Sequence, residues 1–328
     1  MSTHSVHAGE RLPIGQGNPT SSPIHIASAY FYDETAELDA AFADSSRGYV
    51  YSRFGNPTVT GLETAIATLE GTDTAIAFAS GMAAIYAAIV HAVAPGESIV
   101  VSQDVYGATY ALLKDVLTDS GITPHFVDIL DLDTVSSLVR KTNARAILSE
   151  TASNPLIRVA DVSALKSIAS EAGAKLIIDN TFLSPAVSRP AILGADYVVH
   201  STTKYLGGHG DSTGGAIATN EGNAAAIRQR LKLTGAILSP FEGWLIHRGI
   251  KTLPLRMRQH CANAQIVADW LNSESRIDTV FYPGISQVVP EGVFSGDARG
   301  AMVAFEIGTA DRDAVFRFLD ALTMIIPA

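Results

Sequence analysis

The feature that most constrains the fold is a series of short, mostly apolar runs, several of them continuous, that alternate with segments of helical character. The runs are TAIAFAS (74–80), ESIVVS (97–102), ITPHFVDI (122–129), ARAILSE (144–150), AKLIIDN (174–180) and ADYVVHS (195–201). A strand with one face in water alternates apolar and polar residues, so continuous runs indicate a sheet buried on both faces. Such a sheet is mostly parallel and needs helical crossovers. The sequence therefore predicts an α/β fold.

The chain divides into three parts that differ in composition and in the pattern of predicted elements. Residues 1–60 are rich in Gly, Pro, Ser and Asn, which predicts an N-terminal arm with loops that pack on another surface. Residues 61–250 carry the alternation of strands and helices and predict the large domain. Within them, GLETAIATLE predicts a helix that ends at Gly71, and TGGAIATN predicts a further strand for which antiparallel pairing is one option. Residues 251–328 predict the start of a smaller C-terminal domain.

A long helical region joins the second part to the third. The pattern from Phe241 to Asn272 predicts this region, with a kink or break at Pro254, because proline disrupts the hydrogen bonding of a helix interior. The strand MVAFEIG and the helix DRDAVFRFLDAL follow it. The sequence shows no strand partners beyond them that would close a sheet, so we expect the smaller domain to be incomplete.

Composition excludes several classes of function. Of the 328 residues 47% are hydrophobic and 17% charged, and the net charge of −10 argues against nucleic-acid or anionic-membrane partners, which need a basic face. The single cysteine, Cys261, fits a reducing compartment and excludes a disulfide framework. The first residues lack a signal-peptide pattern, and no apolar stretch is long enough to span a membrane. We expect a cytoplasmic protein.

Polar residues follow several of the predicted strands, where ligands bind in sheets of this kind. TAIAFA leads into Ser80, Gly81 and Met82 at the start of a helix, whose backbone N–H groups form a cradle for an anion. ARAILSE leads to Asn154, and AKLIID ends on Asp179. The last strand delivers three further candidates, namely Ser201, Thr203 and Lys204.

An acid and an amine at the ends of two apolar strands indicate a site. A carboxylate such as Asp179 so near the core needs a cationic partner, and a protonated pyridine nitrogen is one. An amine such as that of Lys204, partly removed from water, has a lowered pKa and can condense with an aldehyde. Taken alone, each residue is more often a turn residue or a solvated charge. Together with the anion cradle they favour pyridoxal 5′-phosphate (PLP) as the cofactor.

Seven segments make the chain resemble the Cys/Met-metabolism family of PLP-dependent enzymes. They are GYVYSRFGNPT (48–58), LEG (69–71), SGMAA (80–84), VYGATY (105–110), NP (154–155), IIDNTF (177–182) and HSTTKYLGGHGD (200–211). The resemblance spans nearly the whole chain, and its last two segments are the most specific. It implies the type I, aspartate aminotransferase-like fold of PLP enzymes, with a large cofactor domain and a smaller C-terminal one.

The resemblance also implies roles for individual residues. Lys204 matches the lysine that binds PLP covalently and moves protons on the substrate, and Asp179 matches the partner of the pyridine nitrogen. Tyr106 matches the ring that stacks on PLP and acts as an acid or base at the leaving group. Asn154 matches an asparagine near the 3-oxygen of PLP.

Further residues match ligands of the cofactor phosphate. The backbone of Gly81 and Met82 and the hydroxyls of Ser201 and Thr203 match ligands from the same chain. A further pair, Tyr51 and Arg53, matches residues that reach the phosphate in the neighbouring subunit. The resemblance therefore implies a homodimer or homotetramer with shared PLP sites.

The sequence departs from the family pattern at three places. Val50 replaces an acid that cystathionine enzymes often carry before the tyrosine of YSR, and Ala108 replaces a cysteine typical of methionine γ-lyases. The family's C-terminal region, which carries the arginine for the substrate carboxylate, has no counterpart in this sequence. These departures leave the substrate open.

We therefore predict a carbon–sulfur lyase or sulfur-transfer enzyme that performs γ-elimination or γ-replacement on sulfur amino acids or O-acylhomoserine. The alternative is a truncated, inactive subunit that binds PLP or packs with a full-length paralogue. Residues Ser201 to Lys204 also fit the S-x-x-K motif of penicillin-recognising enzymes, but the S-D-N and K-T-G partners of that motif do not occur. We expect no metal site, because the histidines lack ligand spacing.

Overall fold

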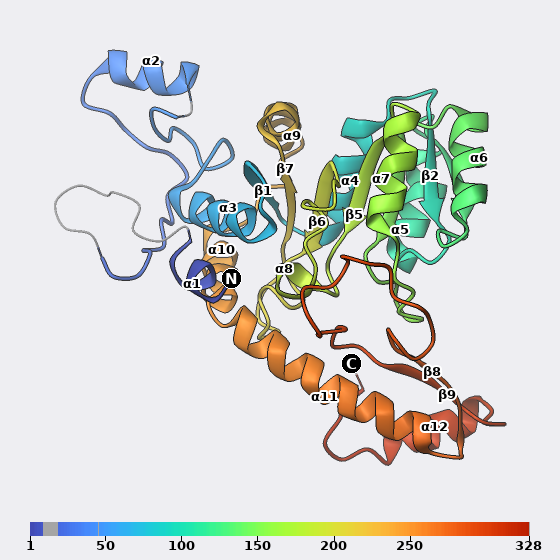
Figure 1. The fold of residues 1–328 in the computed structure, drawn as a ribbon. Helices are drawn as coiled ribbons and strands as arrows, with labels where there is room; N and C mark the ends of the chain where they lie inside the picture. The colour runs from blue at the N-terminus through green and yellow to red at the C-terminus, as the bar shows by residue number, and fades with distance from the viewer. Residues whose placement is uncertain (9–18, 45, 328) are drawn as a thin grey trace.

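The computed structural model describes residues 1–8, 19–44 and 46–327, and their core is a seven-stranded sheet (Figure 1). The strand order is β1-β7-β6-β5-β4-β2-β3. The strands are β1 (Thr74–Phe78), β2 (Ser98–Ser102), β3 (Thr123–Val127), β4 (Ala146–Glu150), β5 (Lys175–Asp179), β6 (Tyr197–Ser201) and β7 (Gly215–Thr219). Only β7 is antiparallel to its neighbours, β1 and β6; the other pairs are parallel. The structure confirms the predicted α/β fold.

Helices cover both faces of this sheet. One layer holds α3 (Pro57–Glu70), α6 (Leu132–Thr142), α7 (Val162–Glu171) and α10 (Pro240–Ile250). The other layer holds α4 (Gly81–Ala92), the π-helical segment η1 (Leu112–Leu117) that continues α5 (Gly107–Ala111), and α9 (Glu221–Thr234). Each central strand therefore lies between two helical layers, as its continuous apolar run predicts.

Successive residues of a strand pack against the two helical layers in turn. In β5, Ile177 packs against the layer of α4, while Leu176 and Ile178 pack against that of α6 and α7. All three side chains are fully buried. Burying one such side chain stabilises the fold by roughly 1.5–3 kcal/mol.

The helix predicted before Gly71 forms with capping at both ends. The side chain of Asn56 accepts a hydrogen bond from Thr58 N, and Pro57 occupies the first helical turn of α3. Gly71 ends the helix in the left-handed conformation, with φ of 81°, which costs glycine no steric strain.

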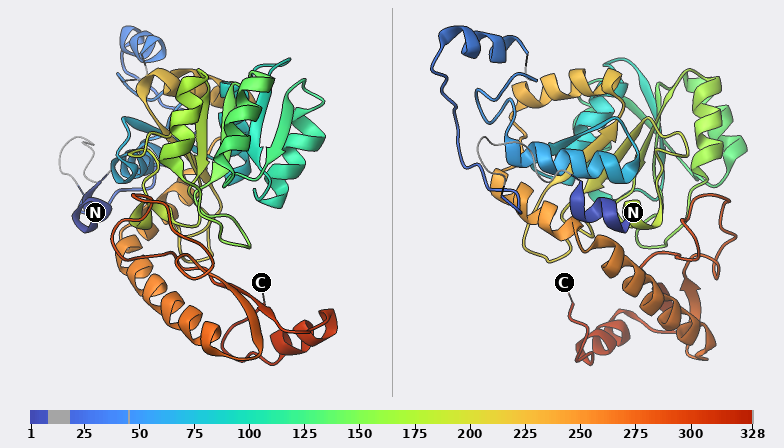
Figure 2. Two further views of the ribbon diagram at one scale, coloured as in Figure 1. Left: turned by 45° about the vertical axis from the view of Figure 1, so that its right-hand side comes forward. Right: turned by 60° about the vertical axis from the view of Figure 1, so that its left-hand side comes forward.

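The predicted break at Pro254 is present as well. The helical region divides into α10, which ends at Ile250, and α11 (Leu253–Ser273), with Pro254 in the first turn. Helix α11 leads to the antiparallel pair β8 (Ile277–Phe281) and β9 (Ala304–Ile307) and to α12 (Arg312–Asp320). Figures 1 and 2 show these elements at the end of α11 that lies far from α10.

The N-terminal region contains α1 (Ser2–His7) and α2 (Thr35–Ala43), of which α2 stands clear of the sheet and its helices (Figures 1 and 2). Large apolar side chains in this region lie in solvent: Ile26 is 79% exposed, Phe31 90% and Phe42 61%. In the described part of the chain, no helix has the length and apolar character that crossing a membrane requires.

Candidate functional site

The candidate site is a hollow of about 270 Å³ at the carboxyl ends of β1, β4, β5 and β6. It contains eight of the predicted cofactor residues, namely Gly81, Met82, Tyr106, Asn154, Asp179, Ser201, Thr203 and Lys204. Parallel strands bring these residues together because their carboxyl ends meet at one edge of the sheet.

The start of α4 forms one wall of the hollow. Ser80 caps the helix by accepting a hydrogen bond from Ala83 N at 3.1 Å. The N–H groups of Gly81 and Met82 make no hydrogen bond within the described residues, so they remain free for a ligand at the positive end of the helix dipole. A Cβ atom at position 81 would lie only 2.8 Å from Ser201 Cβ, so glycine lets the helix approach β6 closely.

The hydroxyls after β6 lie opposite this helix start. Ser201 N donates to Thr181 Oγ1 at 2.8 Å, which fixes the end of the strand. The hydroxyl oxygen of Thr203 accepts a hydrogen bond from Gly214 N at 3.1 Å. The Thr203 hydroxyl in turn donates to Gly214 O at 3.4 Å. The helix start and the Ser201 hydroxyl offer hydrogen-bond donors that a phosphate group accepts.

Asp179 ends β5 inside the hollow, with one oxygen already bound. Its Oδ1 accepts hydrogen bonds from Thr181 N at 3.0 Å and from Thr181 Oγ1 at 2.5 Å. Burial raises the pKa of this carboxyl group, and the two bonds from Thr181 and the nearby His200 oppose that rise. Both bonds go to Oδ1, which leaves Oδ2 for a cationic ligand.

Glu150 ends β4 directly beside Asp179, and the sequence interpretation missed it. The two residues are register partners across the β4–β5 pair, and both line the hollow. Its Oε1 accepts a hydrogen bond from Tyr106 N at 2.7 Å. Burial, and then the charge of Asp179, raise the pKa of Glu150 from 4.5 to about 8.

The remaining predicted residues complete the walls. Tyr106 is the residue before α5, and half of it is exposed. Asn154 precedes a cis peptide bond to Pro155. Lys204 lies in the loop after β6 and makes no ion pair within the described residues.

Two predicted residues, Tyr51 and Arg53, do not line the hollow. The Arg53 guanidinium lies 5.4 Å from the centre of the Tyr51 ring and 5.1 Å from that of Phe54. Its Nη1 donates to the backbone oxygen of Lys232 at 2.5 Å. Within one chain these residues are therefore separate from the other eight.

Several residues of the hollow were not predicted from the sequence, namely Ile85, Thr109, Glu150, Thr181, Phe182 and Thr213. For Glu150 the signal was available, because the run AILSE ends on an acid just as KLIID does. For Thr109 and Phe182 no pattern distinguishes the residue from an ordinary helix or loop position.

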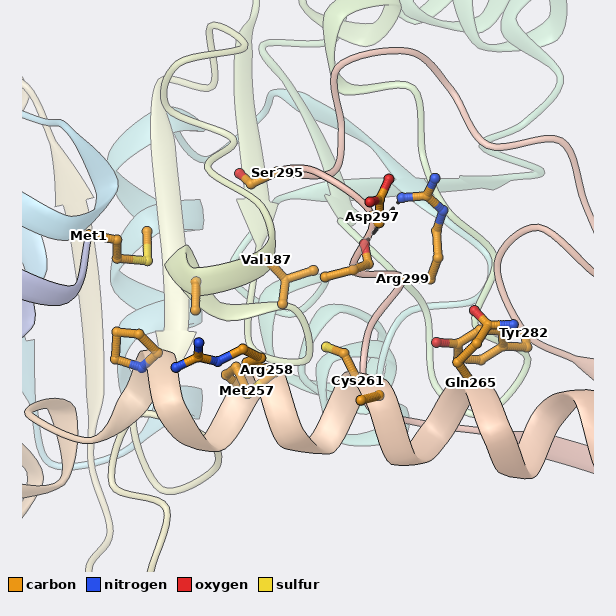
Figure 3. Close-up of a pocket in the computed structure, with 14 residues that line it drawn as sticks. Met1, Val187, Met257, Arg258, Cys261, Gln265, Tyr282, Ser295, Asp297 and Arg299 are labelled. Atoms are coloured by element: carbon orange, nitrogen blue, oxygen red, sulfur yellow. Dashed lines mark hydrogen bonds between the residues drawn. The ribbon is translucent and has the colours of Figure 1, made fainter.

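A larger hollow, of about 520 Å³, lies between α11 and the loop of residues 295–299 (Figure 3). Figure 3 shows the side chains of Met257, Cys261 and Gln265 along one side of α11. This hollow holds none of the predicted residues. None of the described residues that line it belongs to the seven-stranded sheet, so size alone does not identify the site.

The smaller hollow fits PLP in the chemistry of its donors. Gly81 and Met82 present free N–H groups for the phosphate, and Asp179 presents an acceptor for a pyridinium. Lys204 supplies an amine on the same hollow. A family model described as "Cys/Met metabolism PLP-dependent enzyme" matches residues 2–328. The chain belongs to this family.

Relatives within this family carry out different reactions. The chain is 41% identical to a cystathionine β-lyase of Lactococcus lactis, over 98% of this chain and 82% of the relative. It is 38% identical to an L-methionine γ-lyase of Fusobacterium nucleatum, over 94% of this chain and 78% of the relative. The Cys/Met-metabolism family therefore fixes PLP-dependent sulfur amino-acid chemistry and leaves the particular reaction open.

A solved structure of the family agrees with the fold. It is a putative O-acetylhomoserine (thiol)-lyase of Campylobacter jejuni, described with a pyridoxyl-lysine monophosphate. The TM-score is 0.91 at 28% identity, and the match covers 100% of this chain and 89% of the other. The structure thus has the type I PLP-enzyme fold that the sequence implied.

Proposed function

We propose that this protein catalyses PLP-dependent γ-elimination or γ-replacement on sulfur amino acids or O-acylhomoserine. The observation that carries the proposal is the convergence of Lys204, Asp179 and the free N–H groups of Gly81 and Met82 on one hollow. PLP, when bound, supplies the electron sink for this chemistry.

Each residue then has a definite task. Asp179 keeps a negative charge opposite the pyridine nitrogen. The Lys204 amine would hold PLP through its aldehyde, with loss of water, and would move a proton between the α- and β-carbons of the substrate. The Tyr106 phenol lies at the mouth of the hollow, where half of the residue is exposed, and donates a proton to the leaving group. Asn154 holds the 3-oxygen of PLP, and Ser201 and Thr203 hold its phosphate.

The activity can be tested directly. Purified protein with PLP would be given O-succinylhomoserine, O-acetylhomoserine, cystathionine or methionine, each with and without cysteine or sulfide. Keto-acid products identify elimination. A thioether formed with cysteine, or a thiol formed with sulfide, identifies replacement. Bound PLP without turnover of any of these compounds would contradict the proposal and favour an inactive PLP-binding subunit.

We also propose that the working unit is a homodimer or homotetramer, in which Tyr51 and Arg53 reach the phosphate site of the neighbouring chain. Two observations support this proposal. Neither residue lines the hollow of its own chain, and the region that carries them exposes Ile26, Phe31 and Phe42. A second chain packed on this region would remove such apolar side chains from water. The single cysteine of the chain supports a reducing, cytoplasmic location.

A further inference from the structure

Two carboxyl groups lie side by side in the site, at the ends of neighbouring strands. Glu150 and Asp179 are register partners on the parallel strands β4 and β5, and both line the hollow. Like charges in such proximity disfavour each other's ionisation, so the pair titrates in two separate steps. The question is which residue keeps the proton at neutral pH.

The burial of Glu150 favours a neutral acid. The residue is only 7% exposed, and its Oε2 is buried without a hydrogen-bond partner within the described residues. A charged oxygen in that position would carry a large desolvation cost. A protonated Oε2 avoids most of it, while Oε1 still accepts the bond from Tyr106 N.

Specific contacts of Asp179 favour the anion, although burial, the largest influence, raises the pKa of this carboxyl group. Its Oδ1 accepts two hydrogen bonds from Thr181, and the nearby His200 also lowers its pKa. Each of these contacts stabilises a charged carboxylate over a neutral one.

The other charged groups near Glu150 do not reverse this preference. Asp104 raises the pKa of Glu150 further, and it is itself paired with Arg158 at 2.7 Å. Lys204 also lines the hollow, but its amine makes no ion pair with either carboxyl group. The backbone N–H groups of Tyr106 and Asn154 favour the Glu150 anion and are opposed by burial, which is the largest influence.

We propose that Glu150 is a positioning residue of the site: a carboxylic acid kept neutral beside Asp179, whose Oε1 fixes the backbone of Tyr106. The strand pair then delivers one negative charge, on Asp179, to the ligand. The use of that charge for a pyridinium rests on the proposed function, but the position of the proton does not.

Infrared spectroscopy of the apoprotein tests the position of the proton without any cofactor. A protonated carboxyl group has its own C=O stretch, separate from that of a carboxylate. We expect this band at pH 6.5 in the wild-type protein, its loss in Glu150→Gln, and its retention in Asp179→Asn. Because Asp179→Asn removes the neighbouring charge, the band should then titrate at lower pH than in the wild-type protein. Glu63→Gln, at a buried glutamate that contacts Arg228, is the matched control and should keep the band.

The reverse pattern would overturn the proposal. If the band survived in Glu150→Gln and vanished in Asp179→Asn, the proton would lie on Asp179. Absence of the band from the wild-type protein would mean that both groups are ionised. Either variant decides the matter if the other fails to fold, and failure of the enzymatic assays would leave this result unaffected.

The positioning role has a separate readout. Glutamine at position 150 keeps an oxygen that can accept from Tyr106 N, whereas alanine does not. Glu150→Ala should therefore weaken PLP affinity by about tenfold more than Glu150→Gln, the loss of about one hydrogen bond to a backbone group. Equal affinities in the two variants would contradict the positioning role.

Discussion

The carboxyl groups of Glu150 and Asp179 end two adjacent parallel strands and face the same hollow, although 28 residues separate them in the chain. Their environments differ. Asp179 accepts two hydrogen bonds from Thr181, whereas Oε2 of Glu150 has no hydrogen-bond partner within the described residues. Neighbouring acids whose environments push their pKa values apart take different roles at one pH.

The raised pKa of Glu150 predicts a loss of stability of the apoprotein as pH rises. The native state keeps the proton up to about pH 8, whereas the unfolded chain releases it near 4.5. Between these values the unfolded state binds fewer protons, so the free energy of unfolding falls by up to about 1.4 kcal/mol per pH unit. Denaturant unfolding at several pH values measures this slope. In Glu150→Gln the slope should be smaller by the contribution of about one proton. Identical slopes in the two proteins would argue against the raised pKa of Glu150.

Asp179→Asn should bind PLP and lose most of its activity. A neutral amide cannot hold the pyridine nitrogen protonated, although it has a similar shape. We expect kcat to fall by roughly 10²–10³-fold, as when one preorganised electrostatic group is removed. Steady-state kinetics measures this, with Asp161→Asn at the α7 N-cap as the control, since asparagine caps a helix about as well as aspartate. Near-normal turnover of Asp179→Asn would remove this residue from the mechanism.

Gly81→Ala tests the cradle at the start of α4. The added methyl group would lie 2.8 Å from Ser201 Cβ and 3.0 Å from Ser201 Cα, so the helix start has to shift. We expect a loss of stability of about 1–3 kcal/mol and weaker PLP binding. Gly107→Ala, where a Cβ atom meets nothing within 4 Å, is the matched control. Thermal unfolding and PLP titration compare the two, and equal behaviour would exclude the close approach.

Most of the fold could be predicted because its strands are buried on both faces. The run LII of β5 has no alternation, and a sheet between two helical layers buries all of it. The break before α11 was predictable because Pro254 has no backbone N–H and is tolerated in the first turn of a helix but not in its interior. Helix α2 was not predicted, since only Ala41 of its residues is buried and no apolar periodicity marks it. Glu150 could have been suspected from the acid that ends AILSE, but its contacts with Tyr106 and Asp179 could not, because those residues are distant in sequence and meet it only in the fold.

Arg53→Ala tests the shared site. If Arg53 binds the phosphate in the neighbouring chain, its loss should weaken PLP affinity and shift the assembly toward smaller species, because cofactor binding and association are then linked. Light scattering with and without PLP measures the size. Arg47→Ala, at an exposed arginine in the same region, is the control and should change neither. Unchanged affinity in Arg53→Ala, or a monomer that binds PLP tightly, would show that each site is complete in one chain.

The central claim is that Lys204 is the point of covalent PLP attachment, and borohydride reduction followed by peptide mass spectrometry tests it most directly. The chain has seven lysines, so the label can be assigned to one of them. We predict that reduction fixes PLP on the peptide that contains Lys204, that Lys204→Ala abolishes the label, and that Lys141→Ala at an exposed position leaves it in place. A label on another lysine, or a label that survives in Lys204→Ala, would contradict the account.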